Sequence, residues 1–169
     1  FLKLPKEQDC LTHSINRIKK AQQHGNRKMP RLWAKVNGIN HGISVKTAEF
    51  IMDVAVLYNA DVIVFEYLEK KGKKRGSRKQ RLHLWKSQEV QRIVTDKAHR
   101  LGIHIARICA WNTSRLAYDG SGRVLRGKQA GFSSYSVCQF QNGKIYNCDL
   151  SASYNIGARY FIREILKSL

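Results

Sequence analysis

The sequence predicts a mixed α/β fold, because two strand patterns alternate with helical patterns along most of the chain. A continuous apolar run at 61–68 indicates one strand, and an alternating run at 103–109 indicates the next. Apolar residues at helical spacing over 44–59, 86–101 and 150–167 surround these two strands. The resulting order is helix, strand, helix, strand, hairpin, helix.

The N-terminal segment 1–36 is polar and basic, with a break at 24–28 and a second helix start near Pro30. The next helix, 44–59, carries apolar side chains on two sets of positions, so we expect it to be well buried. These positions are Ala48, Ile51, Ala55 and Tyr58, together with Phe50, Val54 and Leu57.

The run at 61–68 is β-branched and aromatic, which indicates a buried strand of a parallel or mixed sheet. Helix 86–101 ends at Gly102, a residue typical of a helix C-terminal cap. Its apolar face is predicted to hold Val90, Ile93, Val94, Ala98 and Leu101.

The last third combines a loop, a hairpin and a helix. Residues 112–136 are rich in Gly and Ser and are predicted to form a loop, while Asn142-Gly143 between two strand-like runs predicts a hairpin over 135–148. In the helix at 150–167 the residues predicted to face inward are Ile156, Phe161, Ile162, Ile165 and Leu166.

The charge balance indicates a polyanionic partner. The chain carries 31 Lys and Arg against 12 Asp and Glu, a formal charge of +19, while its 43% hydrophobic content is that of a folded domain. Nucleic acid is the expected polyanion, because each neutralised phosphate releases counterions. A membrane is not expected as a partner, since the chain has no apolar run of about 18 residues. A basic structural protein without enzymatic activity remains an alternative.

The cysteines indicate neither a disulfide framework nor a zinc site. Cys10, Cys109, Cys138 and Cys148 form no C-x-x-C pair, so reduced cytosolic thiols are expected. Because the sequence starts Phe-Leu-Lys-Leu-Pro without an initiating Met, we expect the chain to be part of a longer protein.

Two carboxylates are the candidate catalytic residues. Glu66 lies near the end of the most apolar strand, where a carboxylate needs a partner, which is either a salt bridge to Arg or Lys or a divalent metal. Asp149 opens the last helix, where it serves as a cap or first-turn charge, or as a metal ligand. Carboxylates that converge from different elements are what a two-metal phosphodiesterase requires.

A basic segment follows Glu66 directly and is the predicted contact to a phosphate backbone. Arg115 is a further candidate contact, and Trp85 and Trp111 are able either to stack on bases or to pack under loops. The basic residues predicted to bind nucleic acid in this segment are Lys71, Lys73, Lys74, Arg75, Arg78, Lys79 and Arg81.

The chain resembles the TnpB proteins and type V CRISPR effectors over most of its length, from about residue 12 to the end. The stretch V-I-V-F-E-Y-L at 62–68 is similar to their second RuvC motif, in which an apolar strand ends in a metal-binding Glu. Residues 82–114, which end in Thr113-Ser114, resemble the helix and strand that follow. The segment from Asp149 to Ile156 is similar to the third motif, D-x-N-A-A-x-N-I.

The resemblance implies an incomplete RNase H-like (RuvC) fold made of 1–111 and 149–169, with a degenerate zinc-ribbon hairpin inserted at 112–148. It implies a guide RNA, a DNA target and the remaining parts of the same effector as partners, in the cytoplasm of a prokaryote. Glu66 and Asp149 would then be both catalytic and metal-binding, with Mg²⁺ or Mn²⁺ as the cofactor.

Two departures from the family pattern stand out. The family has a further Asp on an earlier strand, in its first RuvC motif, and this chain has no such strand pattern before the basic helices. The zinc ribbon of the family has two C-x-x-C pairs, but here Ala117 and Gly120 replace the first pair and Gln141 replaces the mate of Cys138. We therefore expect a hairpin without zinc. A relative that binds guided DNA without cutting it is the second hypothesis.

Overall fold

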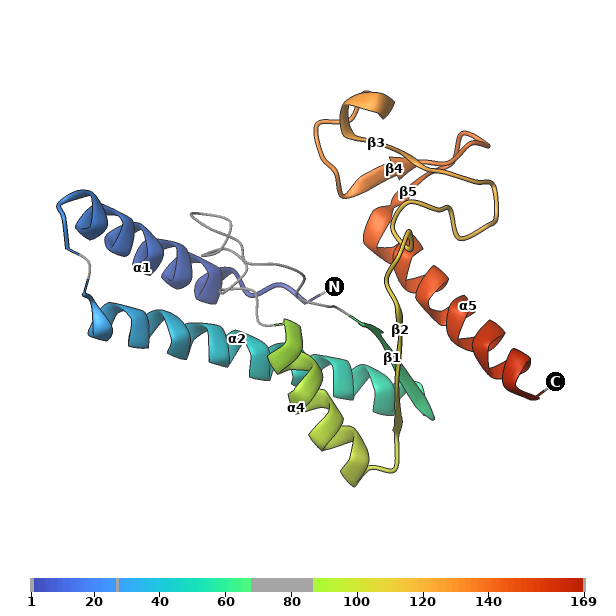
Figure 1. Cartoon of the computed structure of the whole chain (residues 1–169), viewed down its shortest axis with the longest axis horizontal. Coiled ribbons are helices and arrows are strands. Elements are labelled where there is room, and N and C mark those ends of the chain that lie inside the picture. Colours follow the sequence, from blue (N-terminus) through green and yellow to red (C-terminus); the bar gives the residue numbers. More distant parts are fainter. Residues whose placement is uncertain (1, 27, 68–86, 169) are drawn as a thin grey trace. The chain divides into compact units, whose positions relative to one another are not determined.

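The computed structural model describes residues 2–26, 28–67 and 87–168, which form two compact units (Figure 1). Among the described residues, the first unit holds three helices, and the second holds most of two small sheets together with the last helix. The mixed α/β class predicted from the sequence is confirmed. The predicted boundaries of the inserted segment, at 112 and 148, stay a prediction.

In the first unit, one face of a long helix packs against two others. Helix α2 (Pro30–Leu57) contacts both α1 (Pro5–Gln23) and α4 (Ser87–Arg100). Both α1 and α2 begin at a proline, whose fixed φ suits the first helical position. The buried residues of α2 recur every three or four positions and so share one face: Val36, Asn40, Ser44, Ala48, Met52 and Ala55.

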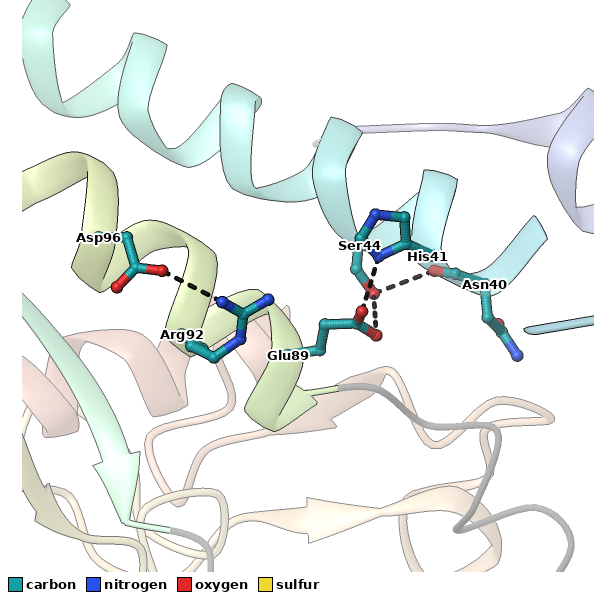
Figure 2. Close-up of polar contacts among 6 residues, drawn as sticks. All are labelled: Asn40, His41, Ser44, Glu89, Arg92 and Asp96. Carbon is teal, nitrogen blue, oxygen red and sulfur yellow. Dashed lines mark hydrogen bonds and ion pairs between the residues drawn. The ribbon is translucent and has the colours of Figure 1, made fainter. Parts of the chain in front are cut away.

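Polar side chains attach the first turn of α4 to α2 (Figure 2). Glu89 Oε1 lies 2.7 Å from His41 Nδ1. The other carboxylate oxygen, Oε2, accepts a longer hydrogen bond of 3.5 Å from Ser44 Oγ. Farther along α4, Arg92 and Asp96 form an exposed pair one turn apart, at 3.2 Å. Glu89 therefore has a structural role in this unit.

The expectation that 44–59 forms a separate, well-buried helix is wrong in two respects. The segment continues the helix that starts at Pro30, and only one of its two apolar faces is buried. Ala48 and Ala55 are buried, but Leu57 and Tyr58 are 73% and 76% exposed. Periodicity shows which side chains share a face, but it does not show how many faces have a neighbour among the described residues.

The second unit contains two parallel strands, β1 (Val62–Tyr67) and β2 (His104–Cys109), which confirm the strands predicted at 61–68 and 103–109. The N–H of His104 donates to the carbonyl of Asp61 at 2.8 Å, so the two strands start at the same end of the sheet. The side chains of β1 are half-buried or exposed, not buried as predicted, because this sheet has two strands among the described residues.

Polar side chains at every fourth position of helix α5 (Cys148–Ser168) bind backbone carbonyls of this unit. Arg159 Nη1 donates to the carbonyl of Cys109 at 2.8 Å, and Arg163 Nη1 donates to that of Arg107 at 2.9 Å. These arginines belong to a set that shares one helical face and that we call the donor stripe: Ser151, Asn155, Arg159 and Arg163.

The two arginines bind the outer edge of β2. In a strand, the N–H and C=O of one residue point to the same side, and successive residues alternate. Since the N–H of His104 points toward β1, the carbonyls of Arg107 and Cys109 point away from it. The guanidinium groups therefore take the place of a neighbouring strand at this edge.

The prediction that the apolar residues of the last helix face inward is wrong for four of the five named. Phe161, Ile162, Ile165 and Leu166 are exposed, with exposed fractions of 57% to 67%, and Ile156 is half-buried. The donor stripe occupies the packed face of α5, so these apolar side chains lie elsewhere on the helix.

A small lobe between β2 and α5 has its own core. The segment predicted as a loop contains the short strand β3 (Leu125–Arg126) and a 3₁₀ turn, and β3 pairs with β4 (Val137–Gln139). The hairpin of β4 and β5 (Ile145–Asn147) is confirmed, and Gly143 in its turn has φ +85°. The buried residues of the lobe are Ala117, Cys138, Phe140 and Cys148.

Phe140 is 1% exposed in this core, so Phe140→Ala should lower the local stability of the hairpin by about 3–5 kcal/mol. Hydrogen exchange of the β4 and β5 amides measures the change. Ile145→Ala, at a position 61% exposed on the same hairpin, should stay within about 0.5 kcal/mol. Equal protection in both variants would show that the lobe does not depend on this core.

Candidate active site and nucleic-acid contacts

Glu66, near the end of β1, has a half-buried side chain whose carboxylate is held by a threonine. Thr113 Oγ1 donates to Glu66 Oε1 at 2.7 Å, and Thr113 is 1% exposed. A hydroxyl bound to a carboxylate at this distance forms a charge-assisted hydrogen bond. The structure thus gives Glu66 a defined orientation from a residue 47 positions later in the chain.

Asp149 lies in the exposed first turn of α5, and a neighbouring residue caps the helix. Asn147 Oδ1 accepts the N–H groups of Asp149 and Leu150, both at 3.0 Å. The cap role that the sequence left open for Asp149 therefore falls to Asn147. The negative charge of Asp149 stays near the positive end of the helix dipole, with its side chain at the surface.

The turn that carries Thr113 is hydrogen-bonded to α5, the helix that has Asp149 in its first turn. Asn155 Nδ2 donates to the carbonyls of Thr113 and Leu116, each at 2.8 Å. Because α5 also packs against β1, the elements that carry the two carboxylates belong to one connected structure.

The donor chemistry of the two carboxylates suits Mg²⁺ or Mn²⁺, which prefer oxygen ligands. In the parts of the chain that the structure describes, no three His, Cys, Asp or Glu side chains come together as a metal-binding group. The described residues therefore match a magnesium site in ligand type but do not supply three such ligands together.

Most of the predicted nucleic-acid contacts, Lys71, Lys73, Lys74, Arg75, Arg78, Lys79 and Arg81, lie outside the described residues. Arg115 is described and exposed, and it follows Thr113 in the same turn. The Arg115 N–H donates to the carbonyl of Asn112, and the Arg115 carbonyl accepts from the N–H of Val124, both at 3.0 Å, so its backbone is fixed while its side chain reaches the surface.

None of the described helices has the length and apolar character needed to cross a membrane.

Two cysteines that form no C-x-x-C pair, Cys138 and Cys148, lie together in the core of the small lobe that contains the hairpin. Cys138 lies on β4, and Cys148 starts α5 directly after β5, where Arg126 Nε donates to its Sγ at 3.1 Å. Burial, reinforced by contact with Cys148, raises the pKa of the Cys138 thiol to about 11. Ala117 completes this core at a position where the family pattern has a cysteine. The sequence spacing gave no sign of this contact, which depends on the pairing of β4 with β5.

Comparison with known proteins finds a curated relative and solved structures that resemble this chain. A TnpB-like protein of Aquifex aeolicus (strain VF5) is 28% identical to this chain, in an alignment that covers 92% of this chain and 53% of that protein. The predicted resemblance to the TnpB and type V effector family is confirmed. No family model matches the chain.

One of the solved structures that this chain resembles is a Cas12f1–sgRNA–target DNA complex. Its TM-score is 0.63 at 20% identity, over 86% of this chain and 40% of that one, which shows a shared fold. The chain thus spans about half the length of the TnpB-like relative and less than half of the Cas12f1 chain.

The raised pKa of Cys138 predicts slow reaction with a disulfide reagent at pH 8. With a pKa of about 11, only about one Cys138 thiol in a thousand is ionised at that pH, and the reactive thiolate becomes commoner as pH rises. The exposed Cys10 and Cys109 should react first, with Cys138 reacting only after denaturation. Mass spectrometry of the labelled protein locates each modified residue. Rapid labelling of Cys138 in the native protein would contradict the packed core.

Proposed function

We propose that the chain is the C-terminal RuvC portion of an RNA-guided, divalent-metal-dependent DNA endonuclease. The observation that carries the proposal is the connection from Glu66 through Thr113 to Asn155 on α5, which ties together the elements of both motif carboxylates. The similarity to a TnpB-like protein and to Cas12f1 supports the same class. Guided cleavage by the whole protein, with its RNA and DNA partners in a prokaryotic cytoplasm, is part of this proposal.

In the proposed site, Glu66 and Asp149 hold Mg²⁺ or Mn²⁺. The bound metal would activate the attacking water and stabilise the departing oxygen. Other residues of the chain position these ligands. Thr113 orients Glu66, and Asn155 fixes the turn that carries Thr113.

The basic residues would hold nucleic-acid backbone while base pairing with a guide RNA supplies sequence specificity. A formal charge of +19 supports this division of roles, because the contacts it favours are to phosphates and not to particular bases. Arg115 stands in the same turn as Thr113, so its exposed side chain would contact phosphate near Glu66.

A second candidate is a guided DNA-binding protein that does not cut and that acts in targeting or repression. The observation in its favour is that, within 2–26, 28–67 and 87–168, no three-ligand metal group is present. Both candidates share the fold and the partners, so only cleavage and its dependence on Glu66 and Asp149 distinguish them.

Glu66→Gln and Asp149→Asn should each abolish guided DNA cleavage by the full-length protein in Mg²⁺ while binding of guide RNA and target DNA remains. Each change removes one negative ligand and keeps nearly the same side-chain volume. The measurement is cleavage of a matched DNA target with the native guide RNA, alongside a gel-shift assay of binding. A loss of at least about a thousandfold is expected for residues that act as metal ligands in catalysis.

Asp96→Asn is the matched control, since Asp96 is an exposed carboxylate on α4 that pairs with Arg92 one turn away. It should cut at the wild-type rate. If the wild type binds its guided target and never cuts, the nuclease proposal fails and the binding protein becomes the better account.

A further inference from the structure

The Thr113 hydroxyl has two acceptors within reach and one proton to give. Its Oγ1 lies 2.7 Å from Glu66 Oε1 and 3.0 Å from the carbonyl oxygen of Ala110. A carboxylate is a stronger acceptor than a backbone carbonyl and is also the nearer one here, which favours donation to Glu66. A carboxylate has about four lone-pair positions, and this bond uses one of them.

The position of Thr113 is set by the backbone around it. Asn112, just before it, adopts φ +59°, a left-handed conformation that Asn tolerates better than most residues. This bend turns the chain directly after β2 and places Thr113 in a buried position, 1% exposed. A buried hydroxyl on a constrained turn loses little rotational entropy when it binds Glu66.

Asn155 fixes this turn from the other side. A side-chain amide has two N–H donors, and those of Asn155 match two carbonyl acceptors, Thr113 and Leu116, at 2.8 Å each. Ser151, one turn earlier on α5, makes a weaker contact of 3.4 Å to the same Leu116 carbonyl. The turn from Thr113 to Leu116 is therefore attached to α5 by side chains one helical turn apart.

We infer that Thr113 is a positioning residue for the Glu66 carboxylate and that Asn155 is a positioning residue for Thr113. The inference rests on the proposed function, in which Glu66 is a metal ligand. Within it, Thr113 sets the direction in which Glu66 presents its oxygens, and Asn155 keeps that direction constant relative to the helix that carries Asp149. Neither residue needs to touch the metal, the water or the DNA.

The test measures Mn²⁺ binding by the full-length protein without RNA, using the electron paramagnetic resonance signal of free Mn²⁺. The Mn²⁺ ions that bind to the wild type but not to Glu66→Gln are assigned to the site that contains Glu66. Thr113→Val removes the hydroxyl at nearly constant volume and should weaken Mn²⁺ binding at this site by about 10- to 100-fold, as loss of an outer partner of a ligand does. Asn155→Ala should weaken it in the same direction.

Three further variants separate positioning from folding. Thr113→Ser and Thr113→Ala differ from one another only in the hydroxyl, so binding should stay close to wild type in the first and fall in the second, even if Thr113→Val does not fold. Thr47→Val removes a hydroxyl that bonds the Ile43 carbonyl on α2 at 2.7 Å, and it should leave Mn²⁺ binding unchanged. The Mn²⁺ concentration for half-maximal guided cleavage should rise in parallel with the loss of binding.

The outcomes distinguish this inference from the proposed function. If Glu66→Gln abolishes Mn²⁺ binding while Thr113→Val and Thr113→Ala bind like wild type, the positioning role is overturned and the metal role of Glu66 stands. If Glu66→Gln itself binds Mn²⁺ like wild type, Glu66 is not a ligand, and both the proposed site and this inference fail.

Discussion

The second unit depends on hydrogen bonds from the donor stripe of α5 to backbone carbonyls between Arg107 and Leu116. Arg163 and Arg159 bind the outer edge of β2, and Asn155 and Ser151 bind the turn that follows it. Within the described parts of the chain these carbonyls have no neighbouring strand on this side, and the donors of α5 supply their hydrogen-bond partners. Such bonds are directional, so they fix the helix against the strand and turn more narrowly than apolar contact would.

This constraint determines what the candidate site is able to do. Without Asn155, the carbonyls of Thr113 and Leu116 would lose their hydrogen-bond donor, and the turn that positions the Thr113 hydroxyl against Glu66 would no longer be fixed to α5. The same helix carries Asp149 in its first turn, with Asn147 as the cap. Strand β1 and helix α5 therefore present their carboxylates from a scaffold held by polar contacts.

The sequence predicted the elements well because their signals are local. The apolar run at β1, the alternation at β2 and the Asn142-Gly143 turn each depend on neighbours in the chain, and all three lie where they were expected. The packing of α5 could not be read in this way. Arginines on a helix usually face solvent, and only the fold shows that Arg159 and Arg163 reach strand carbonyls.

In the candidate site too, some residues could be predicted from local sequence and others could not. Glu66 and Asp149 were identified from local context and family resemblance, and their metal-binding roles remain proposals. The bond from Thr113 to Glu66 spans 47 positions, and the contact of Cys138 with Cys148 requires a paired hairpin, so neither had a local signal. Residues that support a site across the fold are the hardest to find from sequence, because their side chains are common types without a motif of their own.

If Glu66 and Asp149 hold the same divalent metal ion, iron-directed cleavage of the protein backbone should locate that ion beside both residues. Fe²⁺ replaces Mg²⁺ in the full-length protein, and ascorbate with peroxide then generates hydroxyl radicals that cut the chain beside the bound metal. We expect cuts next to both residue 66 and residue 149, and excess Mg²⁺ should suppress both together. Cuts that avoid both positions, or that excess Mg²⁺ does not change, would contradict this shared site.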